Sequence, residues 1–161
     1  DTDRSRGLGD VYKRQAKEYL DEKGVKYIEK TGNTTDEILS AASELAERCD
    51  VVFTPTDNAV MAAESAVAEI LTQAGVPHYT GADSFVASGA FATCGVNYTE
   101  LGQKTAEMAF QILQTGEVPP YHVMEGGIIT VNTEVAAQLS LDYTPFFDMA
   151  NTVNEIETTQ E

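Results

Sequence analysis

Two short groups of polar residues stand where predicted strands end and helices begin, which makes them the best candidates for binding a small molecule. Their members are Thr56, Asp57 and Asn58 in the first group and Asp83 and Ser84 in the second. A carboxylate at such a position can pair with the ammonium group of an amino acid through a charge-assisted hydrogen bond. The alternative is ordinary turn and cap chemistry, in which these side chains only satisfy the first N–H groups of a helix. Thr56 offers a second cap, which would leave the Asp57 carboxylate free for a ligand.

Aromatic and basic residues limit what such a site can hold. Tyr98 and Tyr79 can stack on an aromatic solute, although a tyrosine near a strand end more often packs with its hydroxyl in water. Neither Arg48 nor Lys104 is predicted to lie near the strand ends. A ligand carboxylate would therefore need backbone N–H groups at a helix N-terminus, or donors from outside this chain.

Two strand-to-helix units must position these residues. The apolar run from Val51 to Phe53 predicts a strand buried on both faces, and Pro55 ends it. An apolar stripe at helical spacing follows over about 59–74, and the strand predicted over 76–80 leads into a short helix after Ser84. The carboxyl ends of parallel strands meet at one edge of a sheet, so both polar groups are expected there.

The rest of the chain continues the alternation of helices and strands. Thr34 and Glu37 form a capping box that opens a helix. Further helices are predicted over 16–23, 99–115 and from Asn132 or Thr133 to 139, and further strands over 25–29, 90–96 and 128–131. The tail over 151–161 is polar and acidic, and it is expected to fray. This pattern predicts an α/β fold with three layers, a parallel sheet with helices on both faces.

The charge of the chain excludes whole classes of partner. The net charge is −16 over 161 residues, and beyond Lys30 the only cationic residues are Arg48 and Lys104. Nucleic acid is therefore excluded as a partner, because phosphate binding needs a basic surface. An anionic membrane surface is disfavoured for the same reason. No apolar run approaches the ~18 residues that a membrane-spanning helix needs.

Residues for catalysis, cofactors or metals are not grouped in this sequence. Cys49 and Cys94 form no Cys-x-x-Cys pair and are interpreted as small buried residues, with a disulfide as the alternative. His78 and His122 stand alone, without the spacing of a metal site. There is no phosphate-binding loop and no nucleophile elbow. We therefore expect no enzyme activity, no cofactor and no bound metal.

The first residues differ from the rest in composition. Residues 1–15 hold four of the ten basic residues and show no periodic apolar face. The run from Gly7 to Gln15 looks like a translated adapter at the end of an assembled reading frame. We expect residues 1–15 to be such a non-native segment or to be disordered, and the native chain to begin upstream.

The order of motifs resembles ABC-transporter substrate-binding proteins of the tryptophan/tyrosine type. The motifs are Pro55-Thr-Asp-Asn58, Tyr79-Thr-Gly-Ala-Asp-Ser84, Ser88-Gly-Ala90, Ala92-Thr-Cys-Gly-Val-Asn-Tyr-Thr-Glu-Leu-Gly102 and Val131-Asn132. The likeness covers about residues 15–141 and corresponds to the C-terminal half of such a protein. Members have a type I periplasmic-binding-protein fold, in which two α/β lobes joined by a hinge close on a small solute.

This resemblance implies a division of the chain and a function. Residues 16–98 and 128–141 would form the C-terminal lobe, residues 99–127 would cross the hinge and pack on the missing N-terminal lobe, and residues 142–161 would be an acidic tail. The implied partners are an amino acid, aromatic or branched, and an ABC permease. The implied location is extracytoplasmic, in the periplasm or lipid-anchored at the cell surface, with the secretion signal in the missing half.

Two other functions stay open on the same fold. One is the ligand-sensing domain of a receptor or transcription regulator, which would need a DNA-binding or transmembrane segment upstream. The other is a nucleotide-binding lobe of a Rossmann-type enzyme. The absence of a glycine fingerprint argues against that reading.

Overall fold

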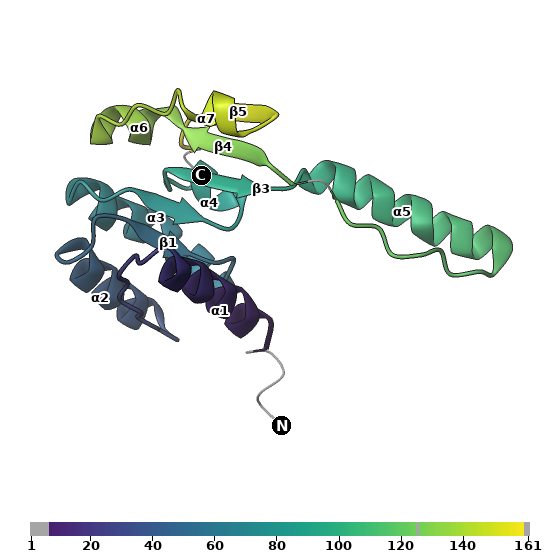
Figure 1. Ribbon diagram of the computed structural model, residues 1–161, viewed down its shortest axis with the longest axis horizontal. Coiled ribbons are helices and arrows are strands. Elements are labelled where there is room, and N and C mark those ends of the chain that lie inside the picture. The colour runs from purple at the N-terminus through teal and green to yellow at the C-terminus, as the bar shows by residue number, and fades with distance from the viewer. Residues whose placement is uncertain (1–6, 125, 160–161) are drawn as a thin grey trace.

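A computed structural model of the chain describes residues 7–124 and 126–159. The helices are α1 (Gly7–Glu22), α2 (Thr35–Ala46), α3 (Asn58–Gln73), α4 (Asp83–Ala87), α5 (Tyr98–Thr115), α6 (Thr133–Leu139) and α7 (Phe146–Met149). The strands are β1 (Val52–Thr54), β2 (His78–Thr80), β3 (Ala92–Gly95), β4 (Ile128–Asn132) and β5 (Thr152–Ile156). Figure 1 shows a sheet flanked by helices, from which α5 projects.

The five strands form one sheet in the order β1-β2-β3-β4-β5. The pairs β1–β2, β2–β3 and β4–β5 are parallel, and β3–β4 is antiparallel. The predicted α/β class with a mostly parallel sheet is therefore confirmed. The single antiparallel pair arises because the chain leaves the sheet after Gly95, passes through α5 and re-enters as β4 at the same end, where Ile128 lies opposite Gly95.

The register of the strands defines two faces with separate cores. Val52 lies opposite His78 on the face that α2 and α3 cover. On the other face, Ala92 lies opposite Val131, and both pack against Phe146 of α7 in a second cluster. Helices thus lie on both faces, and burial of these apolar side chains is the main stabilising contribution to the fold.

Local signals in the sequence begin several helices as predicted. Thr34 accepts a hydrogen bond from Glu37 N at 3.3 Å, and the Glu37 carboxylate accepts one from Asn33 N at 2.7 Å. Asn132 caps α6, with Oδ1 accepting from Val135 N at 3.1 Å. The helix predicted over 99–115 begins at Tyr98, with Asn97 as its cap.

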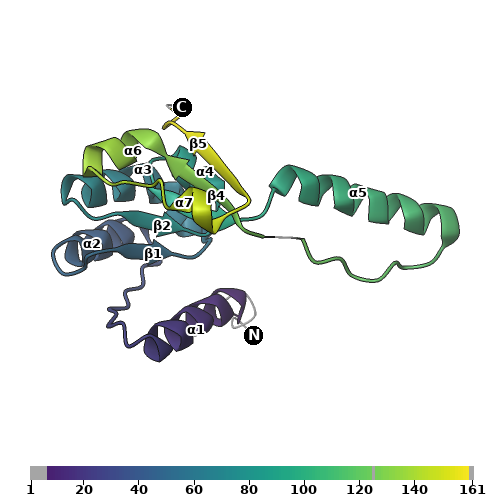
Figure 2. The same ribbon diagram turned by 45° about the horizontal axis from the view of Figure 1, so that its top comes forward.

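Helix α5 has no buried residue and extends away from the sheet in both ribbon views (Figures 1 and 2). Phe110 and Leu113 are 60% and 84% exposed. The apolar side of this helix is therefore left uncovered by the described residues. An amphipathic helix with an uncovered apolar side is typical of a surface that normally has a partner.

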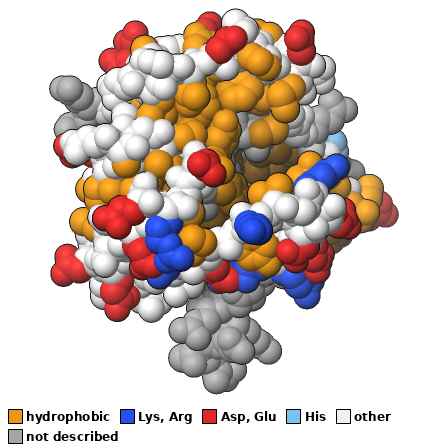
Figure 3. Space-filling model, turned by 60° about the vertical axis from the view of Figure 1, so that its left-hand side comes forward, with side chains coloured by type: hydrophobic (Ala, Val, Ile, Leu, Met, Phe, Trp, Pro, Cys, Tyr) orange, Lys and Arg blue, Asp and Glu red, His pale blue; other side chains and the backbone are white. Residues whose placement is uncertain are grey.

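Two expectations for the ends of the sheet are wrong. Residues 25–29 form no strand, because none of the described strands pairs with them. Val51 and Phe53 are 50% and 54% exposed although Val52 is buried, since β1 is an edge strand and no described helix covers its second face closely. A space-filling view shows apolar side chains gathered across a hollowed part of this end of the molecule (Figure 3).

Segments expected to be irregular are partly regular. Helix α1 runs from Gly7 to Glu22, so residues 7–15 are helical, while residues 1–6 lie outside the described part. The tail does not fray over its described length: β5 pairs with β4, and Thr159 N donates to Ala87 O at 2.9 Å. Cys94 is exposed rather than buried, although it lies on the same face of β3 as the buried Ala92, because it stands near the end of the strand.

Candidate ligand-binding site

The turns that follow β1 and β2 lie against each other. A Cβ atom added to Gly81 would lie 2.5 Å from Thr56 Oγ1 and 2.7 Å from Thr56 N. Only a glycine fits such an approach, because any side chain would collide with the Thr56 backbone. The two polar groups therefore lie at one edge of the sheet, as the parallel register of Thr54 and Thr80 requires.

Asp57 is the N-cap of α3 and stays exposed. Its Oδ1 accepts hydrogen bonds from Ala59 N at 2.8 Å and from Val60 N at 3.1 Å. Thr56 is not the cap, so the hypothesis that it frees Asp57 from this role is wrong. Both bonds use the same oxygen, however, and Oδ2 can still accept from a ligand. Asn58 begins α3 and is exposed beside it.

Asp83 and Tyr98 line the same hollow, which has a volume of about 130 Å³. Asp83 begins α4, whose cap position is Ala82 and has no side-chain cap bond. Tyr98 begins α5 and is 49% exposed. A carboxylate and an aromatic ring thus meet at the carboxyl ends of β2 and β3, where open α/β sheets bind ligands. The volume suits the polar head of a small solute and is below the usual size of a complete ligand pocket.

The floor of this hollow comes from residues that the sequence did not single out. Thr93 and Thr130 face each other across β3 and β4, and both are buried. Thr93 donates to Thr80 O at 2.8 Å. Asn97 caps α5: its Oδ1 accepts from Thr99 N at 3.0 Å and from Glu100 N at 3.1 Å. Asn154 reaches the hollow from β5, and it was missed because β5 was not predicted.

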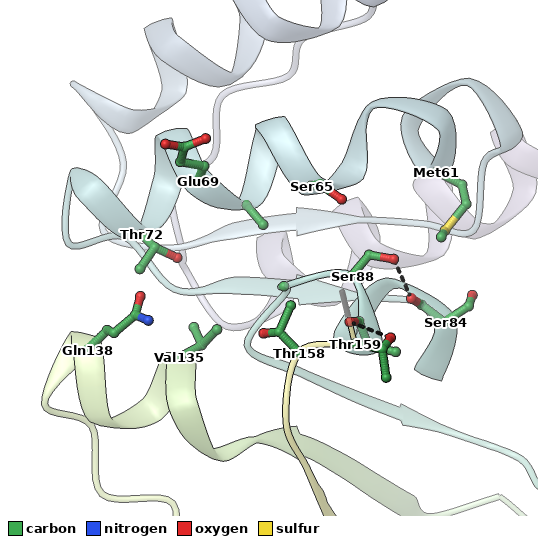
Figure 4. A pocket seen from close by; sticks show the side chains of 13 residues that line it. Met61, Ser65, Glu69, Thr72, Ser84, Ser88, Val135, Gln138, Thr158 and Thr159 are labelled. Atoms are coloured by element: carbon green, nitrogen blue, oxygen red, sulfur yellow. Dashed lines mark hydrogen bonds between the residues drawn. The ribbon is translucent and has the colours of Figure 1, made fainter. Parts of the chain in front are cut away.

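Ser84 does not share this hollow with Asp83. It lines a separate groove of about 720 Å³ between α3, α4 and α6. Figure 4 shows Thr72 and Gln138 on opposite sides of that groove, and Ser88 Oγ donating to Ser84 O at 3.1 Å. The groove lies in the helical layer and away from the strand ends, so the smaller hollow is the better ligand-site candidate.

Tyr79 packs within the core of the second face. Its ring meets that of Phe91 edge to face, with centroids 5.4 Å apart and planes at 88°. Burial raises the pKa of the Tyr79 hydroxyl. Of the two tyrosines considered for stacking, only Tyr98 is therefore exposed enough to meet a ligand.

The charges near the hollow favour a cationic group on the ligand. Asp57 and Asp83 are exposed carboxylates, whereas Arg48 is paired with Glu44 at 2.8 Å. Lys104 is paired with Glu107 at 3.1 Å.

Within residues 7–124 and 126–159, no cluster of three or more His, Cys, Asp or Glu residues is arranged to hold a metal ion. No helix in the same ranges is long and apolar enough to cross a bilayer.

Comparisons with known proteins identify the family of the chain. A family model described as ABC transporter substrate binding protein matches residues 10–145. A tyrosine-binding protein of Clostridioides difficile (strain R20291) is 29% identical over 127 residues. That match covers 77% of this chain and 36% of the relative.

Solved structures share the fold over about half their length. A conserved domain protein from Vibrio cholerae gives a TM-score of 0.77 at 27% identity, with 89% of this chain and 50% of that one covered. The open, ligand-free form of a substrate-binding protein with adhesive properties from Clostridium difficile gives 0.73 at 29%, with 94% and 51% covered. A Streptococcus pneumonia ABC domain in complex with L-Trp gives 0.75 at 23%, with 89% and 51% covered, a likeness of fold alone.

The chain spans 36% of the length of its curated relative and about half the length of these solved structures. The family match, by contrast, extends over most of the chain, from the first turn of α1 to the turn before α7. It includes the turns that carry Asp57, Asp83 and Tyr98. The chain belongs to the ABC transporter substrate-binding protein family.

Proposed function

We propose that this chain supplies one side of a cleft that captures an aromatic amino acid for an ABC importer and performs no chemistry on it. The observation that carries the proposal is the hollow that Asp83 and Tyr98 line together at the carboxyl edge of the sheet. The relative named as a tyrosine-binding protein supports the class of solute.

Each residue of the proposed site has a defined role. Asp83, with no capping bond of its own, pairs with the α-ammonium group of the solute, and Asp57 Oδ2 adds a second acceptor at the same edge. Tyr98 stacks on the aromatic side chain. Thr56 and Asn58 contribute hydroxyl and amide groups to the rim. Ser84 contributes indirectly, through the turn it shares with Asp83.

The second side of the cleft is proposed to come from an N-terminal lobe. The uncovered apolar side of α5 would pack on that lobe, with the stretch 116–127 returning the chain to β4. Residues 16–98 and 128–141 would then form the C-terminal lobe, with β5 completing its sheet. Closure of the two lobes would favour the ligand-bound state through contacts that only the closed form makes.

The remaining parts of the proposal follow from this role. The protein would act outside the cytoplasm, in the periplasm or lipid-anchored at the cell surface, and would deliver its solute to an ABC permease. The acidic surface would meet basic loops on the permease, so docking should weaken as salt is raised. Docking that is insensitive to ionic strength would contradict that electrostatic contact.

The experiment that tests the function is a thermal-shift screen of amino acids on the longer protein that contains this chain. An aromatic amino acid should raise the melting temperature, since a ligand that binds only the folded state stabilises it. Asp83→Asn should abolish most of the shift and leave the unliganded melting temperature close to that of the wild type. No shift with any amino acid would contradict the proposal.

A further inference from the structure

A carboxylate and an imidazole are sealed together between α3 and the sheet, away from the proposed ligand contacts. Glu64 of α3 is 1% exposed and His78 of β2 is 2% exposed. Glu64 Oε1 lies 3.0 Å from His78 Nδ1. Ionisable side chains are rarely buried so completely, because leaving water is costly unless they find partners.

The imidazole also reaches the end of β1. His78 Nε2 lies 2.9 Å from Thr54 Oγ1, the hydroxyl of the last residue of that strand. Glu64, His78 and Thr54 therefore form a continuous chain of polar contacts through α3, β2 and β1. The next residue, Pro55, has a fixed φ angle, so a displacement of Thr54 passes directly to Thr56 and Asp57.

Burial leaves this pair with few hydrogen-bond partners. Among the described residues, neither the Glu64 carboxylate oxygens nor His78 Nδ1 has a well-aligned partner, although Oε1 and Nδ1 lie only 3.0 Å apart. Burial raises the pKa of Glu64, and its contact with His78 lowers it in part. The contact between His78 Nε2 and Thr54 Oγ1 ties the buried pair to β1.

The order hydroxyl, imidazole, carboxylate is also that of a nucleophilic triad. Here the residues that carry the imidazole and the carboxylate are 2% and 1% exposed. A substrate could not reach the atoms that would have to exchange protons with it. The chain of contacts is therefore suited to holding parts of the structure in place.

We propose that Glu64 and His78 are positioning residues, which hold Thr54 through the buried polar chain and thereby fix the Pro55–Asn58 turn at the ligand edge. This inference rests on the proposed function for its biological meaning. Its physical content, the coupling of a buried pair to the turn, can be measured without any ligand. Failure of ligand binding and failure of this coupling are thus separate results.

The test is amide hydrogen exchange by NMR on the 161-residue chain. The informative amides are those of Ala59 and Val60, which Asp57 caps, and the amide of Val76, which is bonded to Leu71 O at 2.9 Å and reports on the far end of α3. Thr54→Val removes the hydroxyl and keeps the shape. It should speed exchange at Ala59 and Val60 by about fivefold or more, the effect of losing one hydrogen bond, with Val76 within about twofold of wild type.

Conservative variants distinguish positioning from packing. Thr54→Ser keeps the hydroxyl and should restore slow exchange in the turn. A second pair of variants acts at the other end of the polar chain. Glu64→Leu removes the polar group beside His78 Nδ1 and should loosen the turn as Thr54→Val does. Glu64→Gln keeps a polar group there and should leave exchange in the turn slow. The inference would be wrong if Glu64→Leu and Thr54→Val both left the exchange rates of Ala59 and Val60 unchanged. It would also be wrong if they raised these rates no more than the rate of Val76.

Discussion

Replacing Asn132 tests how the sheet, α4 and the C-terminal segment are joined. Asn132 is fully buried at the end of β4. Its Nδ2 donates to Val86 O at 3.0 Å and to Thr158 Oγ1 at 2.9 Å, and its Oδ1 caps α6. One side chain thus satisfies groups from three segments that are far apart in sequence.

The cost of Asn132→Ala can be worked from these contacts. Losing the cap costs about 1 kcal/mol. The carbonyl of Val86 loses this donor but still accepts from Gly89 N at 3.1 Å, so the loss of one hydrogen bond costs about 0.5–1.5 kcal/mol. The Thr158 hydroxyl is only partly buried and can turn to water, so it adds little. The free energy of unfolding should therefore fall by about 1.5–2.5 kcal/mol.

Asn132→Asp is the matched variant, because it keeps the capping oxygen and removes both donors. At neutral pH it should be at least as destabilised as Asn132→Ala, since a buried carboxylate would face the Val86 carbonyl. Its defect should shrink as the pH falls and the carboxyl gains a proton that it can donate. Urea unfolding followed by circular dichroism measures both variants, with an unchanged m-value as the check on two-state behaviour. A loss below about 1 kcal/mol in the alanine variant would refute the reasoning.

Three further predictions concern the edge of the sheet and the buried pair. Asp57→Ala should cost about 1 kcal/mol in urea unfolding, whereas Asp57→Asn keeps the capping oxygen and should cost much less; equal losses would contradict the capping role. Gly81→Ala should destabilise by more than about 1 kcal/mol because its Cβ would collide with Thr56, while Gly102→Ala, which meets nothing within 4 Å on α5, should be neutral or stabilising in the same assay. The pKa of Glu64 is raised in the folded state, so between the unfolded and the folded pKa the folded chain keeps a proton that the unfolded chain has released. The free energy of unfolding should therefore fall as pH rises through that range. Urea titrations at successive pH values measure this slope, and Glu64→Gln should remove it.

The alternation of strands and helices could be predicted because its signals are local. Caps at Thr34 and Asn132 and the apolar stripe of α3 depend on neighbouring residues. The direction of β4 could not be predicted, since it depends on how the chain returns after α5. Strand β5 was missed because Thr152–Ile156 is mostly polar and has no run of apolar residues, although it pairs with β4, the preceding strand of the chain.

The candidate site, like the fold, could be predicted only in part from the sequence. Placement of Asp57 and Asp83 at one edge follows from strand ends, which the sequence predicts. The direction of each side chain depends on helix orientation, and so Asp83 faces the hollow while Ser84 faces the helical groove. The link between Glu64 and His78 was invisible in the sequence, because it needs α3 to pack on β2 with one particular rotation.

The most direct test of the central claim is isothermal titration of L-tyrosine into the longer protein that contains this chain, with Asp83→Asn as its matched variant. The account predicts saturable binding at one site in the wild type. Loss of a charge-assisted hydrogen bond worth about 1.5–3 kcal/mol should weaken binding about tenfold or more in the variant. Saturable binding that Asp83→Asn leaves unchanged, or no binding of any aromatic amino acid, would contradict the account.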